Sequence, residues 1–181
     1  MKFNKNAIPN YITALRIIGT VLLIFIKPLS SPFYIVYTIC GISDALDGFI
    51  ARRTETATDF GARLDSIADL LFYAVMLIKI FPILLLRLPT EIWYIVSATV
   101  IIRLISYILA AVKYRRFAAL HTYMNKFTGL LVFTVPYVLS FSVSTAFCFI
   151  TTVVAGIASL EELLIHILSK QYNANIKTII R

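Results

Sequence analysis

Six apolar stretches of roughly 20 residues each follow one another along the chain, with only short gaps between them. They run near residues 11–28, 32–52, 60–82, 91–112, 126–144 and 146–168. Stretches of this length are typical of helices that cross a membrane, and 60% of all residues are hydrophobic. We therefore expect an all-α fold: an integral membrane bundle of six transmembrane helices, formed by a single domain over residues 1–181.

The distribution of Lys and Arg predicts which side of the membrane each gap faces. Twelve basic residues fall on one side, and three on the other: Lys2, Lys5, Arg52, Arg53, Arg63, Lys113, Arg115, Arg116, Lys126, Lys170, Lys177 and Arg181 against Lys27, Lys79 and Arg87. The positive-inside rule then places both termini in the cytoplasm. The net charge of +8 suits a cytoplasmic rim that meets anionic lipid. We expect no nucleic-acid binding, because the basic residues are scattered between apolar stretches.

Prolines mark several of the predicted helix ends. Pro9 and Asn10 precede the first apolar stretch, and Pro28 and Pro32 bracket a tight first turn. Pro82 predicts the end of the third helix.

Four aspartates lie at the ends of the second and third stretches: Asp44, Asp47, Asp65 and Asp69. Carboxylates at membrane depth are costly unless a partner compensates their charge. The sequence shows no local cluster of basic residues that would face them. A divalent metal is the natural partner, because Mg²⁺ and Mn²⁺ favour clustered carboxylate oxygens and then bind phosphate.

Helical periodicity places the aspartates on two faces that also carry small residues. One face spans roughly 100° and the other roughly 80° at a helical advance of about 100° per residue. The first holds Asp44, Asp47, Gly48 and Ala51, and the second holds Gly61, Asp65 and Asp69. The small residues either leave room for a bulky group above the carboxylates or let the helices pack closely.

Two such helices could hold one or two metal ions, which together would clamp a phosphoryl group. A carboxylate less committed to metal can remove a proton from an acceptor hydroxyl. Asp69 is the predicted general base, because it is the last of the four and lies deepest in the membrane.

The full spacing from Asp44 to Asp69 is Asp-x2-Asp-Gly-x2-Ala-Arg-x8-Gly-x3-Asp-x3-Asp. It resembles the signature of the CDP-alcohol phosphatidyltransferases, integral membrane enzymes of phospholipid synthesis. The resemblance implies a metal-dependent enzyme that moves the phosphatidyl group of CDP-diacylglycerol to a small polar alcohol and releases CMP. We also expect a bacterial cell membrane, and the distribution of Lys and Arg predicts that the active site lies at its cytoplasmic face.

The resemblance assigns roles to individual residues. Asp44, Asp47 and Asp65 would bind Mg²⁺ or Mn²⁺, and Asp69 would be shared between metal binding and general base. The CDP-lipid would be held by Asn10, Thr13, Arg16, Gly48, Ala51, Arg52 and Gly61. On the residues alone, Arg52 is as well explained as a cytoplasmic anchor, and Arg16 as a side chain that reaches to the interface.

The acceptor alcohol is suggested by basic residues in the second half of the chain. Arg103 and Lys126 resemble the basic positions of glycerophosphate-using relatives, and His121 lies in the same connection as Lys126. These residues favour glycerol 3-phosphate as the acceptor. Leu70 favours serine instead, because glycerophosphate-using members often have Lys there, and an inositol compound is a further alternative. Pairing of Arg103 with Glu161 or Glu162 would explain the buried arginine without any acceptor.

Two alternatives from other classes follow from the same residues. Acids within a membrane also mark ion pathways, which favours a cation-coupled transporter, although no internal repeat supports it. A purely structural membrane subunit would leave the four acids unexplained. Gly156, with its small neighbours Ala155 and Ala158, could line the contact of a homodimer, which members of the resembled family commonly form.

Overall fold

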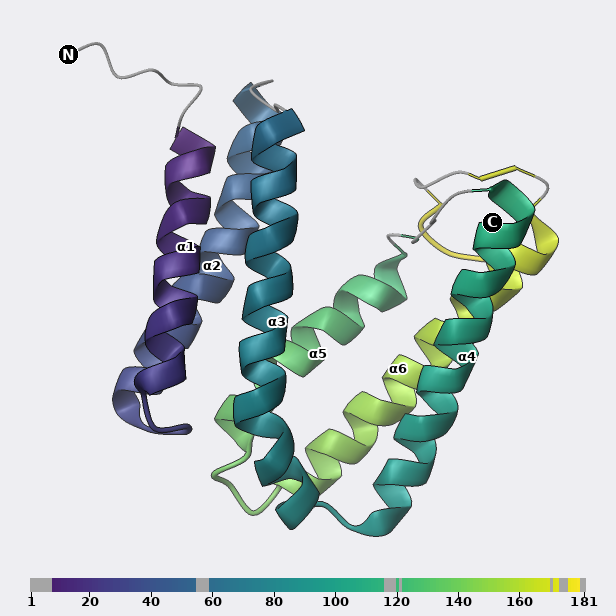
Figure 1. Cartoon of the computed structure of the whole chain (residues 1–181). Helices are drawn as coiled ribbons and strands as arrows, with labels where there is room; N and C mark the ends of the chain where they lie inside the picture. Colours follow the sequence, from purple (N-terminus) through teal and green to yellow (C-terminus); the bar gives the residue numbers. More distant parts are fainter. Residues whose placement is uncertain are drawn as a thin grey trace. The chain divides into compact units, whose positions relative to one another are not determined.

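The computed structural model describes residues 8–54, 59–115, 120, 122–169, 171–172 and 176–179, with the backbone alone at 8–10, 45–54, 59–60 and 62–63. This described part contains six α-helices and no strand, as predicted (Figure 1). The helices are α1 (Ile8–Phe25), α2 (Ser31–Thr54), α3 (Asp59–Arg87), α4 (Thr90–Tyr114), α5 (Tyr123–Val138) and α6 (Ser144–Leu168). Each corresponds to one predicted apolar stretch.

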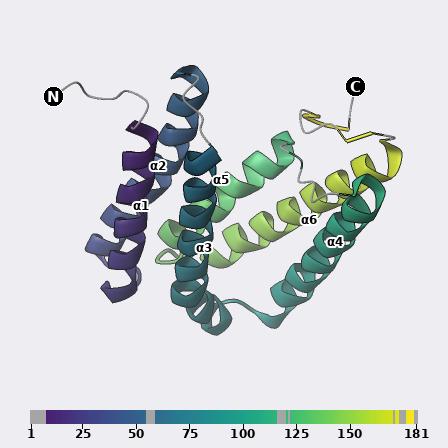
Figure 2. The same cartoon turned by 45° about the horizontal axis from the view of Figure 1, so that its top comes forward.

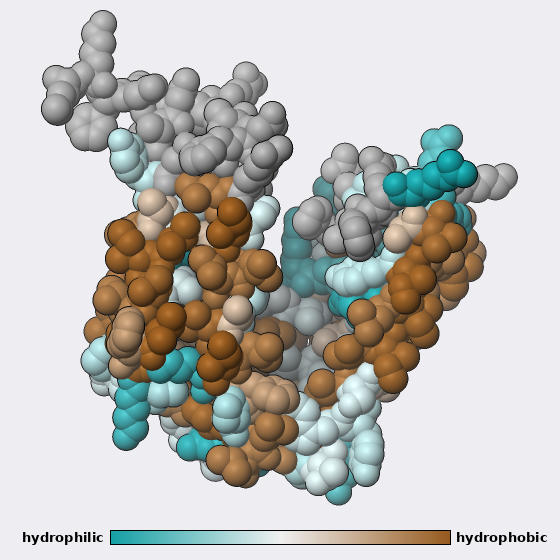
Figure 3. Space-filling model, viewed as in Figure 1, coloured by the Kyte–Doolittle hydropathy of each residue, from teal (hydrophilic) through white to brown (hydrophobic). Residues whose placement is uncertain are grey.

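Within the described residues, three helical segments are long and apolar enough to cross a membrane. These segments are Leu64–Arg87 within α3, Thr90–Tyr114, which is α4, and Ser144–Leu168, which is α6. The apolar part of α1, Tyr11–Phe25, is shorter. Figure 3 shows hydrophobic side chains over much of the visible surface of α1, α3 and α4. A hydrophobic surface of this extent is typical of helices that face lipid.

The chain forms two compact units, residues 1–86 and 87–181. In the first unit α1 packs against α2, and α1, α2 and α3 lie side by side in both views (Figures 1 and 2). Aromatic stacking joins α2 to α3, because the rings of Tyr37 and Phe72 lie 5.6 Å apart and nearly parallel. Lys79 on α3 also donates to the backbone oxygen of Ile26, at 2.9 Å. These contacts hold α3 beside the α1–α2 pair.

Gly19 is the point of closest approach between α1 and α2. A Cβ atom built on it would lie 2.7 Å from the Sγ of Cys40. We expect Gly19→Ala to lower the free energy of unfolding by about 1–3 kcal/mol, because Cys40 has to move out of a packed contact. Thermal unfolding of the purified protein in detergent measures this change.

Gly129 provides the matched control, because a Cβ atom there would meet nothing within 4 Å. Gly129→Ala should keep or raise the melting temperature, since Ala is the better helix former by about 1 kcal/mol. Adding Cys40→Ala to Gly19→Ala should restore stability. A melting temperature unchanged by Gly19→Ala would show that the two helices do not meet there.

In the second unit α6 packs against both α4 and α5. Gly156 belongs to this packing, because a Cβ atom there would lie 3.3 Å from Oγ1 of Thr99 on α4. The small residue thus serves a contact between helices of the same chain. The homodimer remains a prediction.

The prediction from Pro82 is wrong, because α3 continues through it to Arg87. A helix at membrane depth tolerates a proline because neighbouring helices, polar side chains and local adjustments of the backbone satisfy the groups that the proline frees. Pro136 lies inside α5 in the same way. Pro28 and Pro32 behave as expected, because Pro28 lies in the turn between α1 and α2 and Pro32 lies at the start of α2. Pro89 caps α4.

Candidate active site

Helices α2 and α3 bring three of the four signature aspartates together. One carboxylate oxygen each from Asp44, Asp65 and Asp69 lies within 4.8 Å of the others. Asp65 and Asp69 are one turn apart on α3, as the periodicity predicted, and Asp44 approaches them from α2. The side chains are 51%, 42% and 40% exposed, so a ligand can reach the oxygens.

The fourth aspartate, Asp47, stands three residues after Asp44 on the backbone of α2. Its side chain lies outside the described residues, as do those of Gly48, Ala51 and Arg52. The helical backbone is continuous through this segment, so the predicted register on α2 is present.

A buried arginine of α1 faces the three carboxylates. Nη1 of Arg16 lies 2.7 Å from Oδ1 of Asp44, and Nη2 lies 2.7 Å from Oδ1 of Asp65. Nη1 also pairs with Oδ1 of Asp69. The sequence shows no local cluster of basic residues near the aspartates, and in the structure one arginine from another helix pairs with them instead. One guanidinium with its forked donors can contact several carboxylates at once, so no cluster of basic residues is needed.

Side chains of α1 and α2 contact the backbone carbonyl oxygen of Arg16. Thr20 donates to the Arg16 carbonyl oxygen at 2.8 Å, and Cys40 of α2 lies 3.8 Å from the same oxygen. Thr13, Arg16 and Thr20 are all buried on one face of α1. A guanidinium buried in this way is stable only because carboxylates pair with it.

The donor set suits a divalent metal of the hard type. Three carboxylates from two rigid helices converge within the span that one ion or a pair of ions can bridge. The Arg16 guanidinium already shows that these oxygens act together on one cation. The residues of this site therefore fit Mg²⁺ or Mn²⁺.

Two predicted nucleotide-binding residues are described beside this cluster. Thr13 is buried on α1 one turn before Arg16, and Gly61 lies on α3 one turn before Asp65. The backbone of Asn10 is part of α1, and its side chain lies outside the described residues. The first unit thus holds the described members of both the metal set and the CDP-lipid set.

The predicted acceptor-binding residues belong to the second unit. Arg103 on α4 pairs with Glu162 on α6 and also donates to Asn125 on α5. This confirms the pairing that explains Arg103 without an acceptor, although the Arg103 side chain is only partly buried. Lys126 is exposed in the first turn of α5, and His121 lies outside the described residues.

Asn125 is the one member of this network that the sequence did not single out. Its only local signal was Thr122, a helix-capping residue three positions earlier, whose side chain accepts from the Asn125 N–H.

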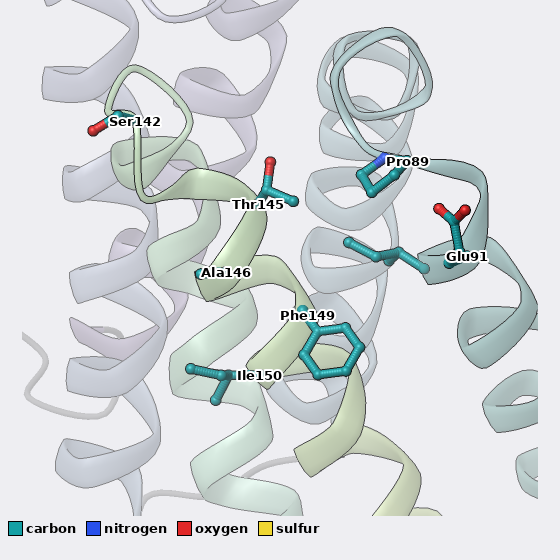
Figure 4. Close-up of a pocket in the computed structure, with 8 residues that line it drawn as sticks. Pro89, Glu91, Ser142, Thr145, Ala146, Phe149 and Ile150 are labelled. Atoms are coloured by element: carbon teal, nitrogen blue, oxygen red, sulfur yellow. The ribbon is translucent and has the colours of Figure 1, made fainter.

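A separate depression in the second unit has a volume of about 590 Å³. Figure 4 shows that it lies between the start of α4 and the start of α6, and its lining includes Ile92, Phe149 and Ile150. None of the predicted site residues lines it. Its walls are mostly apolar, and we assign it no chemistry.

The family model described as CDP-alcohol phosphatidyltransferase matches residues 6–164. The chain belongs to this family. No solved structure matches it.

Curated relatives carry more specific names. A CDP-diacylglycerol–glycerol-3-phosphate 3-phosphatidyltransferase of Pseudomonas fluorescens is 39% identical over 100 residues, which are 52% of this chain and 49% of the relative. The protein of that name from Escherichia coli is 35% identical over 85 residues, 44% of this chain and 45% of the relative. A CDP-diacylglycerol–serine O-phosphatidyltransferase of Methanocaldococcus jannaschii is 43% identical over 68 residues, 38% of this chain and 31% of the relative. The chain thus matches about half or less of the length of these relatives.

Proposed function

We propose that this protein transfers the phosphatidyl group of CDP-diacylglycerol to glycerol 3-phosphate and releases CMP. The observation that carries the proposal is the convergence of the carboxylates of Asp44, Asp65 and Asp69. Membership of the family supports the reaction class, and the names of the Pseudomonas and Escherichia relatives support the acceptor. Membership of this family leaves the transporter and the purely structural subunit without support.

The signature aspartates perform the chemistry in this proposal. Asp44, Asp47 and Asp65, with a share from Asp69, would hold one or two Mg²⁺ or Mn²⁺ ions, and these ions would neutralise charge on the diphosphate. Asp69 takes the proton from the acceptor hydroxyl. The acceptor oxygen forms a bond to the phosphorus on the lipid side, and the bond from that phosphorus to the CMP oxygen breaks. Asp69 later gives the proton to solvent.

The remaining predicted residues bind and orient the two substrates. Arg16, Arg52, Asn10 and Thr13 hold the nucleotide and its phosphates, and Gly48, Ala51 and Gly61 leave space for them. Arg103, Lys126 and His121 bind the anionic group of the acceptor. Binding both reactants in one orientation provides much of the rate advantage, because it removes the entropic cost of bringing them together.

The proposal places the protein in a bacterial cell membrane as a bundle of six transmembrane helices. The excess of Lys and Arg in alternate connections supports cytoplasmic termini. The signature aspartates then lie at the cytoplasmic face, where activated nucleotides are found. The hydrophobic surfaces of the helices support burial of the acyl chains of the substrate in the bilayer.

Serine is the second candidate acceptor. The Methanocaldococcus relative is named for serine, and Leu70 stands directly after Asp69, where glycerophosphate-using members often have Lys. The pairing of Arg103 with Glu162 also weakens the argument that a buried arginine requires a phosphorylated acceptor.

One assay separates the candidates. Purified protein is incubated with CDP-diacylglycerol and Mn²⁺, together with glycerol 3-phosphate, L-serine or an inositol compound, and the released CMP is measured. We expect CMP to be released only when glycerol 3-phosphate is present. Release that depends on serine alone would change the acceptor but keep the reaction class. No CMP with any alcohol would contradict the proposed function.

A further inference from the structure

The carboxylate of Glu162 is buried near the end of α6, and other segments use both of its oxygens. Oε2 accepts hydrogen bonds from Nη1 of Arg103 on α4 and, at 2.9 Å, from Nδ2 of Asn125 on α5. Oε1 accepts from the backbone N–H of Leu120 at 3.3 Å. A single side chain of α6 therefore joins α4, α5 and the end of the connection between them.

Asn125 completes this network. Its Oδ1 accepts from both Nη1 and Nη2 of Arg103 at 3.1 Å, and its Nδ2 also donates to the carbonyl oxygen of Leu120 at 2.9 Å. Its backbone N–H donates to Oγ1 of the buried Thr122 at 3.1 Å. Leu120, in the segment that leads into α5, is thus held by Glu162 of α6 and by Asn125 of α5 itself. Asn125 is held in turn by Arg103 of α4.

The Arg103–Glu162 pair is asymmetric in its exposure. The Glu162 side chain is 1% exposed, whereas the Arg103 side chain is 24% exposed. The buried Glu162 carboxylate can bind only groups of the protein, whereas part of the Arg103 guanidinium stays accessible to a ligand. Lys126, the residue after Asn125, is exposed as well.

The packing of the helices does not by itself require the Arg103–Glu162 ion pair. Replacing a buried ion pair by apolar residues of similar volume is often neutral or even stabilising. What a carboxylate adds is direction, because it fixes the orientation of the guanidinium and of the turn that carries Lys126. Supporting residues of this kind commonly set the geometry of the groups that bind ligand.

We propose that Glu162 is a positioning residue that holds Arg103 and the first turn of α5 ready for the anionic group of the acceptor. This anionic group is a phosphate or a carboxylate, and it lies next to the hydroxyl of the acceptor. This inference rests on the proposed function, and it gives a role to a buried acid that the reaction itself does not use.

The test compares the Michaelis constants of the two substrates in Glu162→Gln. We expect KM for the acceptor that the wild type uses to rise about ten-fold or more, the effect of losing a charged hydrogen bond. The KM for CDP-diacylglycerol should stay within about two-fold, because Glu162 does not touch that substrate in this proposal. A purely structural role would not separate the two constants.

Glu161→Gln is the matched control. Its carboxylate is the neighbouring buried acid of α6, but it accepts from Thr178 and from the N–H of Ile179 in the C-terminal segment. We expect it to leave the acceptor KM unchanged even where it lowers the melting temperature. Asn125→Ala is the second test variant, should Glu162→Gln fail to fold, and it should raise the acceptor KM in the same selective way.

The outcomes distinguish this inference from the proposed function. A wild-type protein that releases no CMP overturns both. A wild-type protein that turns over, with both variants showing an unchanged acceptor KM or an equal rise in both constants, overturns only the role of Glu162.

Discussion

Asp69→Asn is expected to reduce CMP release by about 10²–10⁴-fold, the usual contribution of a general base. The amide cannot accept the proton of the acceptor hydroxyl, although it occupies the same space. Arg16 keeps its pairing with Asp44 and Asp65 in this variant, so the fold around the site should persist. Initial rates of CMP release, measured with saturating acceptor, test the expectation.

Two controls accompany this experiment. Glu91→Gln changes an exposed carboxylate at the start of α4 and should leave the rate unchanged. The melting temperature of Asp69→Asn should remain near that of the wild type, which excludes unfolding as the cause. A folded Asp69→Asn protein that turns over at the wild-type rate would remove the assigned role.

Arg16→Gln is expected to make the stability of the protein depend on metal. The Arg16 guanidinium contacts three carboxylates, and removing it leaves their negative charges close together without a cation. Breaking a fully buried pair costs about 3–5 kcal/mol, but these carboxylates are partly exposed to water, so we expect a loss of about 2 kcal/mol. Thermal unfolding in EDTA should show this loss, and Mn²⁺ should recover it.

The quantity to compare is the rise in melting temperature that Mn²⁺ causes in Arg16→Gln and in the wild type. Mn²⁺ should raise the melting temperature of Arg16→Gln more than that of the wild type, because in the wild type the metal has to compete with the guanidinium for the carboxylates. Arg16→Lys keeps the charge without the forked donors, so its rise in melting temperature with Mn²⁺ should lie between those of the wild type and Arg16→Gln. An equal metal effect in all three proteins would mean that Arg16 and metal do not share these oxygens.

The sequence predicted the elements of this protein better than the contacts between them. Apolar length and helical periodicity identify each helix and the acidic faces of α2 and α3, because both depend on local spacing. The pairing of Arg16 with the aspartates depends on how closely α1 approaches α2 and α3. That approach is set by packing at Gly19 and by the stacked rings of Tyr37 and Phe72, which no periodicity reveals.

Two other residues show the same limit. Pro82 predicted a helix end by a rule that holds in water, and the apolar surroundings of α3 override it. Arg103 predicted an anionic partner correctly, but the choice between Glu162 and a substrate depended on the geometry of α4 and α6. The residue type predicts which groups need partners, but the partners themselves are known only from the fold.

The carboxylates of α2 and α3 are expected to bind a divalent cation, and the proposed function depends on this binding. Binding of Mn²⁺ to the purified protein, followed by the electron paramagnetic resonance signal of the free ion, measures this directly and without any substrate. We predict one or two bound ions per chain in the wild type and loss of that binding in the Asp44→Asn, Asp65→Asn double variant. Undiminished Mn²⁺ binding by a folded double variant would contradict the account.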